Sequence, residues 1–349
     1  MEVFESIRAL IVFAIAFIVA LGITPFVYRA LLKYGLKKRN IRDAATAPVF
    51  YEHHKHKFDT PTMGGVIIWG TVLGLAVILF LGDLAFDGFL GYLNFVSRPE
   101  TYVPLAALAF GAIVGFIDDF WGIIGKGSGK GGGITIKHKL ALYTLVSLIG
   151  AWWFHIRLGW SEIYVPFLGL VDLGAWYMLF FVFVVVATAF SANETDGLDG
   201  LSGGVLFFSF CAMAIVSFIM NRFDLAAMNA AILGALLAFL WYNVHPAKFF
   251  MGDTGSMGLG ITLGVMAMFT NTALFLPFFG FILLIESGSV IIQVLHKKLL
   301  GRKLFLSTPI HHHFEGLGWP ETQVTMRFWI ISGVMTILGL ILFFMARFI

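Results

Sequence analysis

The sequence predicts an all-α integral membrane protein built around ten transmembrane helices. Hydrophobic residues make up 59% of the 349-residue chain and charged residues only 12%, against roughly 25% charged in an ordinary soluble domain. The apolar residues gather in ten runs, near 7–32, 64–82, 103–117, 138–158, 174–190, 201–220, 225–244, 256–272, 273–296 and 325–347. Most runs reach the roughly 20 residues that a helix needs to cross a bilayer. They lack the alternation of barrel strands, so helices are the class that can satisfy the backbone in lipid.

The connections between the runs differ in character. The first run follows Arg8 and has no small-residue cleavage site, which predicts a retained helix rather than a signal peptide. Residues 33–62 form a basic connection. The glycine-rich stretch 125–133 lacks the residue order of a P-loop and is interpreted as a flexible linker. The segment from Ser161 to Asp172 predicts a small β-hairpin.

The chain is predicted to form a single membrane domain over residues 1–349, since it shows no internal repeat and no boundary to a soluble domain. Its one cysteine, Cys211, excludes an internal disulfide framework and a site with several cysteine ligands.

The basic residues predict the orientation in the membrane. Of the 23 Lys and Arg residues, only five fall on the side that carries both termini: Arg8, Arg98, Arg157, Arg222 and Arg347. The other 18 lie in the alternate loops or at their edges. Because Lys and Arg are enriched in cytoplasmic loops, these loops are predicted to be cytoplasmic and both termini to be outside. The same loops carry nearly all of the motif-like polar residues.

Two adjacent carboxylates, Asp118 and Asp119, directly follow an apolar run. Such a pair often marks only a solvated helix end. Beside a bilayer, however, the pair is costly unless a cation compensates its charge. Magnesium commonly binds one or two carboxylates together with substrate phosphates. The pair therefore favours metal-assisted chemistry, with helix capping as the alternative.

A second cluster has the spacing Asn193-x-x-Asp196-x-x-Asp199, with Gly197 and Gly200 interleaved. In a helix this spacing places the three polar side chains on one face. In a turn the glycines allow close approach of the backbone. Either geometry suits a nucleotide or a sugar phosphate. The alternative is an Asx-rich turn that binds no ligand.

A third cluster joins the aromatic pair Phe249 and Phe250 to Asp253. Either ring could stack on a nucleotide base, because aromatic faces accept bases, although anchoring at the membrane interface is expected for one of them. Asp253 precedes an apolar run and could cap a helix. The same position suits a metal ligand.

The consecutive histidines His311, His312 and His313 cannot all face one way. The spacing of a metalloprotease helix is absent, so hydrogen bonds and charge supplied to a diphosphate fit better than a zinc site. Glu286 is separately informative, since an ionisable group within an apolar run needs a partner or a helix break.

Five segments, in order along nearly the whole chain, resemble the signatures of the phospho-N-acetylmuramoyl-pentapeptide transferases, a family of polyprenyl-phosphate N-acetylhexosamine-1-phosphate transferases. The segments are TPTMGG at 60–65, the pair Asp118 and Asp119, NETDGLDG at 193–200, FMGDTGS at 250–256 and PIHHHFE at 309–315. Each motif alone is weak, but five in order between membrane spans are highly specific. The triple histidine and the TPTMGG run favour this family over its relatives.

The resemblance implies a ten-helix enzyme of the bacterial inner membrane, usually a homodimer, with a broken ninth helix and an active site of cytoplasmic loops. Glu286 and its small neighbours are the expected place of that break. The family transfers phospho-MurNAc-pentapeptide from UDP-MurNAc-pentapeptide to undecaprenyl phosphate with Mg²⁺, forming lipid I and UMP in peptidoglycan synthesis. Expected partners are these substrates, membrane lipid and a second copy of the chain, and no nucleic acid. Direct displacement and an aspartyl intermediate both stay open.

The resemblance also implies roles for single residues. Asp253 is expected to bind Mg²⁺, and Asp118 or Asp119 to activate or orient the lipid phosphate. Asn193 and Asp196 are expected to hold the uridine together with Phe250. The other expected catalytic or substrate-binding residues are Lys57, Thr62, Lys137, Asp199, His311, His312 and His313.

Three positions depart from the family pattern. Gly122 and Leu317 stand at or near positions where a Lys is common. The missing Lys at Gly122 predicts the loss of a phosphate contact, for which Lys126 or Lys130 could compensate. Glu194 replaces a commonly apolar residue and adds negative charge beside the expected nucleotide site.

Two other functions stay open. A transferase acting on UDP-N-acetylglucosamine would be distinguished by a direct donor assay. A transporter would explain the spans and Glu286, but transport sites usually lie near the membrane midplane, whereas these carboxylates gather at one face.

Overall fold

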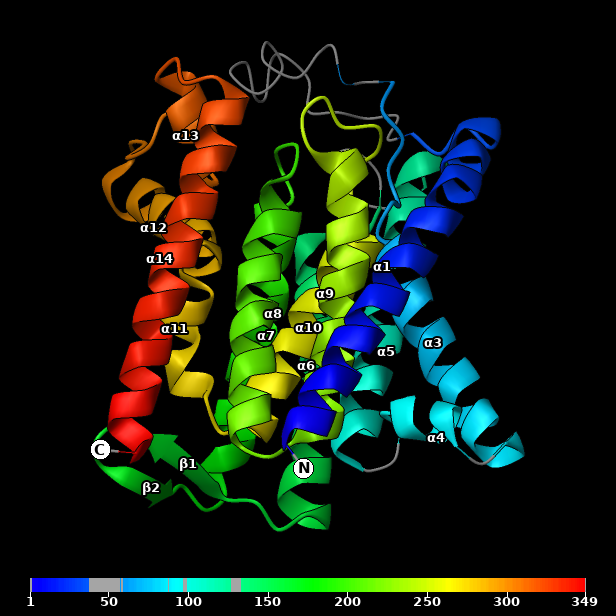
Figure 1. Cartoon of the computed structure of the whole chain (residues 1–349). Coiled ribbons are helices and arrows are strands. Elements are labelled where there is room, and N and C mark those ends of the chain that lie inside the picture. Colours follow the sequence, from blue (N-terminus) through cyan, green and yellow to red (C-terminus); the bar gives the residue numbers. More distant parts are fainter. Residues whose placement is uncertain are drawn as a thin grey trace.

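Long helices lying side by side form most of the chain (Figure 1). The structure is a computed structural model, and it describes residues 2–37, 57, 59–86, 88–96, 99–126 and 133–348. The long helices are α1 (Glu2–Lys33), α3 (Val66–Ala85), α5 (Pro99–Ile123), α6 (Ile136–Trp152), α7 (Trp176–Thr195), α8 (Leu201–Ile219), α9 (Phe223–Asn243), α10 (Asp253–Phe269), α12 (Phe281–Leu300) and α14 (Glu321–Phe348). The shorter elements are α4 (Phe89–Leu93), η2 (Trp153–Arg157), η3 (Ala273–Phe275), α11 (Leu276–Phe279) and α13 (Ile310–Gly316).

The described helices confirm a multi-pass membrane protein. Within the described residues, eight helices are long and apolar enough to cross a membrane, and the number rises to nine if one bent pair counts as a single span. The remaining apolar run coincides with α10, which has 17 residues. All ten predicted runs therefore fall on helices.

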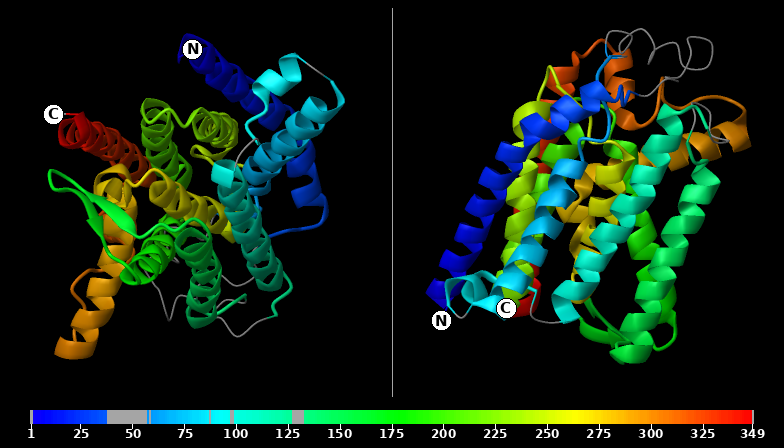
Figure 2. Two further views of the ribbon diagram at one scale, coloured as in Figure 1. Left: turned by 90° about the horizontal axis from the view of Figure 1, so that it is seen from below. Right: turned by 90° about the vertical axis from the view of Figure 1, so that its right-hand side faces the viewer.

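The bent pair is the predicted broken helix, but it breaks at a different residue. The segment Ala273–Phe279 meets α12 at an angle of 90°. Gly280 lies between the two and ends α11, while α12 runs on through Glu286 without interruption. The expected break at Glu286 is therefore wrong. Beyond the bend, α12 projects away from the rest of the bundle (Figure 2).

Helix α10 lies at the centre of the bundle. Every residue from Asp253 to Phe269 is buried, and α10 packs mainly against α5 and α7. Close approach to α5 depends on Gly115, where an added Cβ would lie 2.0 Å from the carbonyl oxygen of Asp253. The end of α5 and the start of α10 are thus held against each other at the site described below.

The two ends of the bundle differ. Both termini and the hairpin lie at one end, while α13 and the turns after α7 and α9 lie at the other (Figure 1). The hairpin pairs β1 (Glu162–Val165) antiparallel with β2 (Gly169–Asp172), which confirms the prediction for this segment. Residues 127–132 of the predicted flexible linker lie outside the described residues, and so do residues 38–56 and 58 of the basic connection.

Candidate functional site

Three helices bring two carboxylates together around one ammonium group. Asp118 lies near the end of α5, Asp253 is the first residue of α10, and Lys139 lies in the first turn of α6. The Lys139 Nζ atom is 2.7 Å from Asp118 Oδ2 and also bonds to Asp253 Oδ2. Asn193, near the end of α7, donates from Nδ2 to Asp253 Oδ1 at 2.8 Å. Two carboxylates distant in sequence thus share one cation.

The neighbouring Asp119 has different surroundings. Its Oδ2 accepts a hydrogen bond of 3.0 Å from the backbone N–H of Thr254. The first N–H groups of a helix lack partners within the helix, so this contact ties the start of α10 to α5. Of the predicted pair, Asp118 is the carboxylate that shares Lys139 with Asp253.

Lys139 was not among the predicted site residues, whereas Lys137 was. Lys137 is exposed, and Lys139 is partly buried between the two carboxylates. Residues two apart on a helix do not share a face. Which lysine turns inward depends on how α6 is rotated about its own axis, and the sequence alone does not give this rotation or the start of α6 at Ile136.

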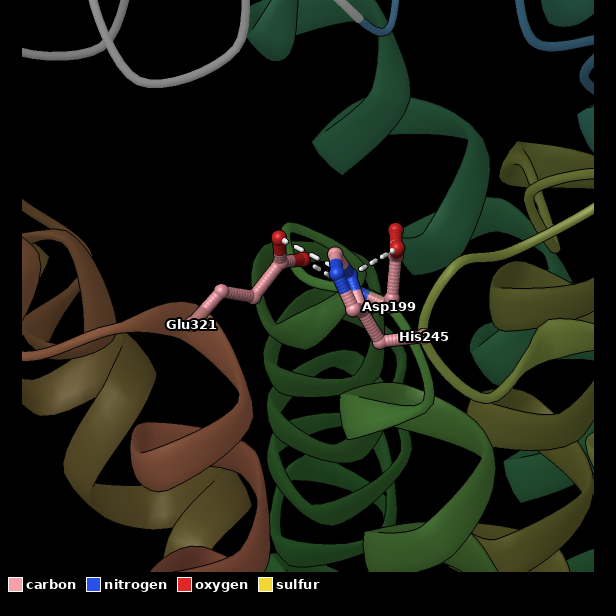
Figure 3. Close-up of side chains that lie close together, drawn as sticks. All are labelled: Asp199, His245 and Glu321. Carbon is pink, nitrogen blue, oxygen red and sulfur yellow. Dashed lines mark hydrogen bonds and ion pairs between the residues drawn. The ribbon is translucent and has the colours of Figure 1, made fainter.

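A second charged cluster surrounds Asp199 in the turn between α7 and α8. Asp199 Oδ1 is 2.6 Å from Lys57 Nζ, and Asp199 Oδ2 is 2.9 Å from His245 Nδ1. Glu321, at the start of α14, bonds to Lys57 and accepts a hydrogen bond of 2.6 Å from the Asp199 backbone N–H. Figure 3 shows the side chains of Asp199, His245 and Glu321 converging from three separate elements. We call Lys57, Asp199, His245 and Glu321 the Asp199 cluster.

The charge balance of the Asp199 cluster keeps Asp199 ionised. Burial alone would raise the pKa of Asp199, but the Lys57 ammonium and hydrogen bonds from Ala247 N–H and His245 lower it below its ordinary value. The oxygens and ring nitrogen of Asp199, His245 and Glu321 are close enough to hold a metal ion. The Lys57 ammonium, however, already bonds to both carboxylates and supplies their counter-charge.

The loop between α9 and α10 joins the two clusters. The backbone N–H of Gly252 donates to Asp196 Oδ2 at 2.9 Å. The Lys57 Nζ atom lies 5.7 Å from the centre of the Phe250 ring, which is half-buried. Phe249 is instead fully buried in the core, so Phe250 is the ring of the pair that remains partly accessible. Thr62 is buried beside Gly252.

The three histidines make three different contacts, as their consecutive positions predict. His311 Nδ1 is 2.9 Å from Glu286 Oε2, and His312 Nδ1 is 2.7 Å from Glu315 Oε2. His313 Nδ1 accepts a hydrogen bond of 3.2 Å from the backbone N–H of Leu306. Within the described part of the chain, none of the three belongs to a convergent set of metal ligands.

The α7–α8 turn places its three predicted side chains on different partners. Asn193 contacts Asp253, Asp196 contacts the backbone of Gly252, and Asp199 contacts Lys57. Helix α7 ends at Thr195, so the helical and the turn interpretations each hold for part of the segment. His311 also reaches this turn, since its Nε2 would lie 2.2 Å from a Cβ added at Gly197.

Sequence reasoning missed Lys139, His245 and Glu321 as members of these clusters and gave Glu286 no partner. The four lie on α6, the α9–α10 loop, α14 and α12. Glu286 carried the clearest signal, because an acidic residue in an apolar run requires compensation. The other three had no signal beyond being polar residues near the predicted cytoplasmic face.

Comparison with known proteins assigns the family. Residues 101–271 match the family model described as Glycosyl transferase family 4. A phospho-N-acetylmuramoyl-pentapeptide-transferase of Desulforudis audaxviator is 38% identical over 96% of this chain and 98% of its own length. Enzymes of the same name from Anoxybacillus flavithermus and Nautilia profundicola are 35% and 34% identical, over 93% and 94% of this chain and 95% and 92% of their own lengths. The chain therefore belongs to the phospho-N-acetylmuramoyl-pentapeptide-transferase family.

Proposed function

We propose that this chain transfers phospho-MurNAc-pentapeptide from UDP-MurNAc-pentapeptide to undecaprenyl phosphate, releasing UMP and forming lipid I for peptidoglycan synthesis. The name of its relatives supports the reaction. The observation that carries the proposal is the convergence of Asp118 and Asp253 on one cation. Attack on a diphosphate needs neutralisation of charge and positioning more than covalent machinery.

The residues around Asp253 fit a Mg²⁺ ion. The carboxylates of Asp118 and Asp253 meet there and supply oxygen ligands, which magnesium prefers. Lys139 supplies the counter-charge between these carboxylates in the structure, and Mg²⁺ would take over this role when bound. Asp253 would hold the ion, with Asp118 beside it. When bound, Mg²⁺ would neutralise negative charge on the diphosphate.

The protein's own groups would position the two substrates. Asp118 would orient the lipid phosphate, and Lys139 would supply positive charge to the same position. Asp119 would keep α10 in place through Thr254. The Phe250 ring would stack on the uracil, an interaction worth about 1–3 kcal/mol in single-strand binding sites.

The remaining proposed contacts surround these groups. Asn193 and Asp196 would hold the nucleoside from the turn that links both clusters. The residues proposed to contact phosphate, sugar or nucleotide are Lys57, Thr62, Lys137, Asp199, His311, His312 and His313.

The proposed setting is the bacterial inner membrane. Ten spans would result if the buried α10 and the bent pair each cross the bilayer, and residues 1–349 would form one membrane domain. The basic loops favour a cytoplasmic active site with both termini outside. Soluble donor would then arrive from the cytoplasm and lipid acceptor from the membrane. We further propose a homodimer.

Release of UMP tests the proposed reaction. Purified protein with Mg²⁺ and UDP-MurNAc-pentapeptide is expected to release UMP only when undecaprenyl phosphate is added. Preference for UDP-N-acetylglucosamine as donor would replace the proposal with the related transferase function. Substrate flux into sealed vesicles without UMP release would instead assign a transporter.

A further inference from the structure

Glu286 and His311 form a fully buried hydrogen-bonded pair that links two helices. Glu286 lies in the second turn of α12 and His311 in the first turn of α13, and both have 0% exposure. Glu286 Oε2 is 2.9 Å from His311 Nδ1. The backbone N–H groups of Ile310 and His311 also face this carboxylate. The Glu286 side chain thus contacts both the His311 imidazole and the backbone at the start of α13.

The pair determines which ring nitrogen of His311 faces the candidate site. A carboxylate next to Nδ1 favours the proton on that nitrogen and fixes the orientation of the ring, as in carboxylate–histidine pairs that support metal ligands. The other nitrogen, Nε2, lies against Gly197 in the turn between Asp196 and Asp199. The imidazole therefore presents Nε2 to the segment proposed to hold the nucleotide.

Helix α12 is fixed where it carries Glu286. Ser287 Oγ is 2.7 Å from Ser191 Oγ of α7. Ser289 Oγ donates to the Glu286 carbonyl oxygen at 2.7 Å. The carboxylate thus comes from a part of α12 that is bonded to the bundle, before the helix projects outward.

Stability alone does not account for this pair. Burying polar groups is costly, and replacing both partners of a buried ion pair by packed apolar residues is often neutral or stabilising. The fold therefore does not by itself require a polar pair at these two positions. Control over the His311 ring is the contribution that an apolar residue cannot make.

We propose that Glu286 is a positioning residue that holds His311 in the orientation in which Nε2 lies against Gly197 and the ring sets the turn proposed to hold the nucleotide donor. This inference rests on the proposed function. It assigns to a residue outside the five sequence motifs a part in the transfer step. Glu286 itself touches no substrate.

A double-mutant cycle tests the proposal. The variants are Glu286→Gln, His311→Asn and the double variant. Asparagine keeps an amide near the Nδ1 position but removes Nε2. Each single variant is expected to lower kcat for UMP release by about 10-fold to 100-fold, the usual cost of losing an orienting partner, with a smaller change in KM. The double variant is expected to match His311→Asn within about 2-fold, because Glu286 acts only through His311.

Two further variants separate positioning from structure. Glu286→Asp keeps the carboxylate and is expected to recover part of the activity lost in Glu286→Gln. Ser289→Ala removes a buried hydrogen bond from the same part of α12 and is expected to retain wild-type kcat. Thermal unfolding in detergent checks that each variant is folded. If Glu286→Gln does not fold, Glu286→Asp takes its place in the cycle.

The outcomes distinguish this inference from the proposed function. The positioning role would be overturned by any one of three results. These are a loss of activity in the double variant equal to the product of the two single losses, full activity of Glu286→Gln, or full activity of His311→Asn. If the wild-type protein releases no UMP, the proposed reaction is wrong. In that case the affinity of each variant for UDP in the presence of Mg²⁺ is measured by calorimetry. Non-additive losses of binding free energy would support the positioning role, and additive losses would reject it.

Discussion

At the scale of single residues, Asp253 joins three helices of the candidate site. It begins α10, pairs with Lys139 and accepts a hydrogen bond from Asn193. Its carboxylate therefore determines where positive charge gathers, and a substitution there tests the proposed metal site directly.

We expect Asp253→Asn to lower turnover by about 100-fold or more, with the membrane fold intact. A lost metal ligand removes several kcal/mol of charge stabilisation in the transition state, and each 1.36 kcal/mol changes the rate tenfold. UMP release at saturating Mg²⁺ measures the effect. Asp172→Asn, in the hairpin at the other end of the bundle, is the matched control. Near-normal turnover in the Asp253 variant would remove Asp253 from the metal site.

A second prediction concerns Gly197. An added Cβ would lie 2.2 Å from His311 Nε2, and the fully buried imidazole has little room to move away. Gly197→Ala is therefore expected to lower kcat at least about 10-fold by displacing the ring, a cost in the usual range for lost positioning. Gly74→Ala, in α3, meets nothing within 4 Å and should remain active. Equal activity of the two variants would show that the His311 ring can move freely.

For single residues, the sequence predicts which side chains belong to the candidate site better than it predicts which side chains they contact. Asp118 and Asp253 could be named because carboxylates beside an apolar run need compensation. Lys139 could not be preferred to Lys137, since only the start of α6 decides which lysine turns inward. Glu321 could not be connected to Asp199 because 122 residues separate them.

At the scale of elements, the Asp199 cluster fastens α14 to the α7–α8 turn and to the loop after α9. Thr325 of α14 adds a hydrogen bond of 3.2 Å to the Asp199 carbonyl oxygen, and Trp329 adds one of 3.1 Å to that of Gly200. Lys57 contributes positive charge from a segment more than 100 residues away in sequence.

Lys57→Met is expected to destabilise the protein by about 3–5 kcal/mol, the cost of leaving buried carboxylates without their cation. The side chains of Lys57 and Asp199 are 8% and 2% exposed. Lys37→Met is the control, because Lys37 pairs with Asp59, whose side chain is 94% exposed, and surface pairs contribute about 0–1 kcal/mol. Thermal unfolding in detergent compares the two. A similar loss for both variants would mean that burial does not strengthen the Lys57 pair.

Asp199 is expected to contribute to the pH dependence of stability. Its pKa is lowered in the folded protein, so its contribution to stability is present above the ordinary value of 3.8 and is lost as pH falls through the lowered pKa. We expect the unfolding midpoint to fall more steeply below about pH 4 in the wild type than in Asp199→Asn. Parallel curves for the two proteins across pH 3 to 7 would contradict this assignment.

The broken helix shows where element prediction reaches its limit. The apolar run 273–296 marks one span, but hydropathy carries no information about its direction in space. The acidic Glu286 was the visible irregularity, whereas the bend occurs at the smaller irregularity of Gly280. A buried histidine compensates Glu286, so the helix has no need to break there.

At the scale of the whole molecule, the order of the helices agrees with the order predicted from the sequence, because a helix that crosses a bilayer needs an apolar run of sufficient length. The run 201–220 matches α8, and the run 225–244 matches α9 within two residues. Sequence could not show how the helices pack. In particular, the burial of α10 on every side depends on neighbours that are distant in the chain.

Orientation in the membrane is tested by labelling. In a Cys211→Ser background, Ser128→Cys and Thr308→Cys are expected to react with an impermeant thiol reagent only from the cytoplasmic side, and Ser161→Cys only from outside. The asymmetry of the basic residues is the physical reason. Labelling of all three positions from the same side would overturn the proposed topology.

The burial of α10 should shield the candidate site from changes in membrane thickness. Hydrophobic mismatch acts on helices that touch lipid, which respond by tilting or kinking. Helix α10, with Asp253 at its first residue, is enclosed by protein along its whole length, while α1 and α14 present many apolar side chains outward. A thinner or thicker bilayer should therefore tilt the outer helices before it alters the spacing between Asp253 and Asp118, and the chemistry should tolerate changes in lipid chain length.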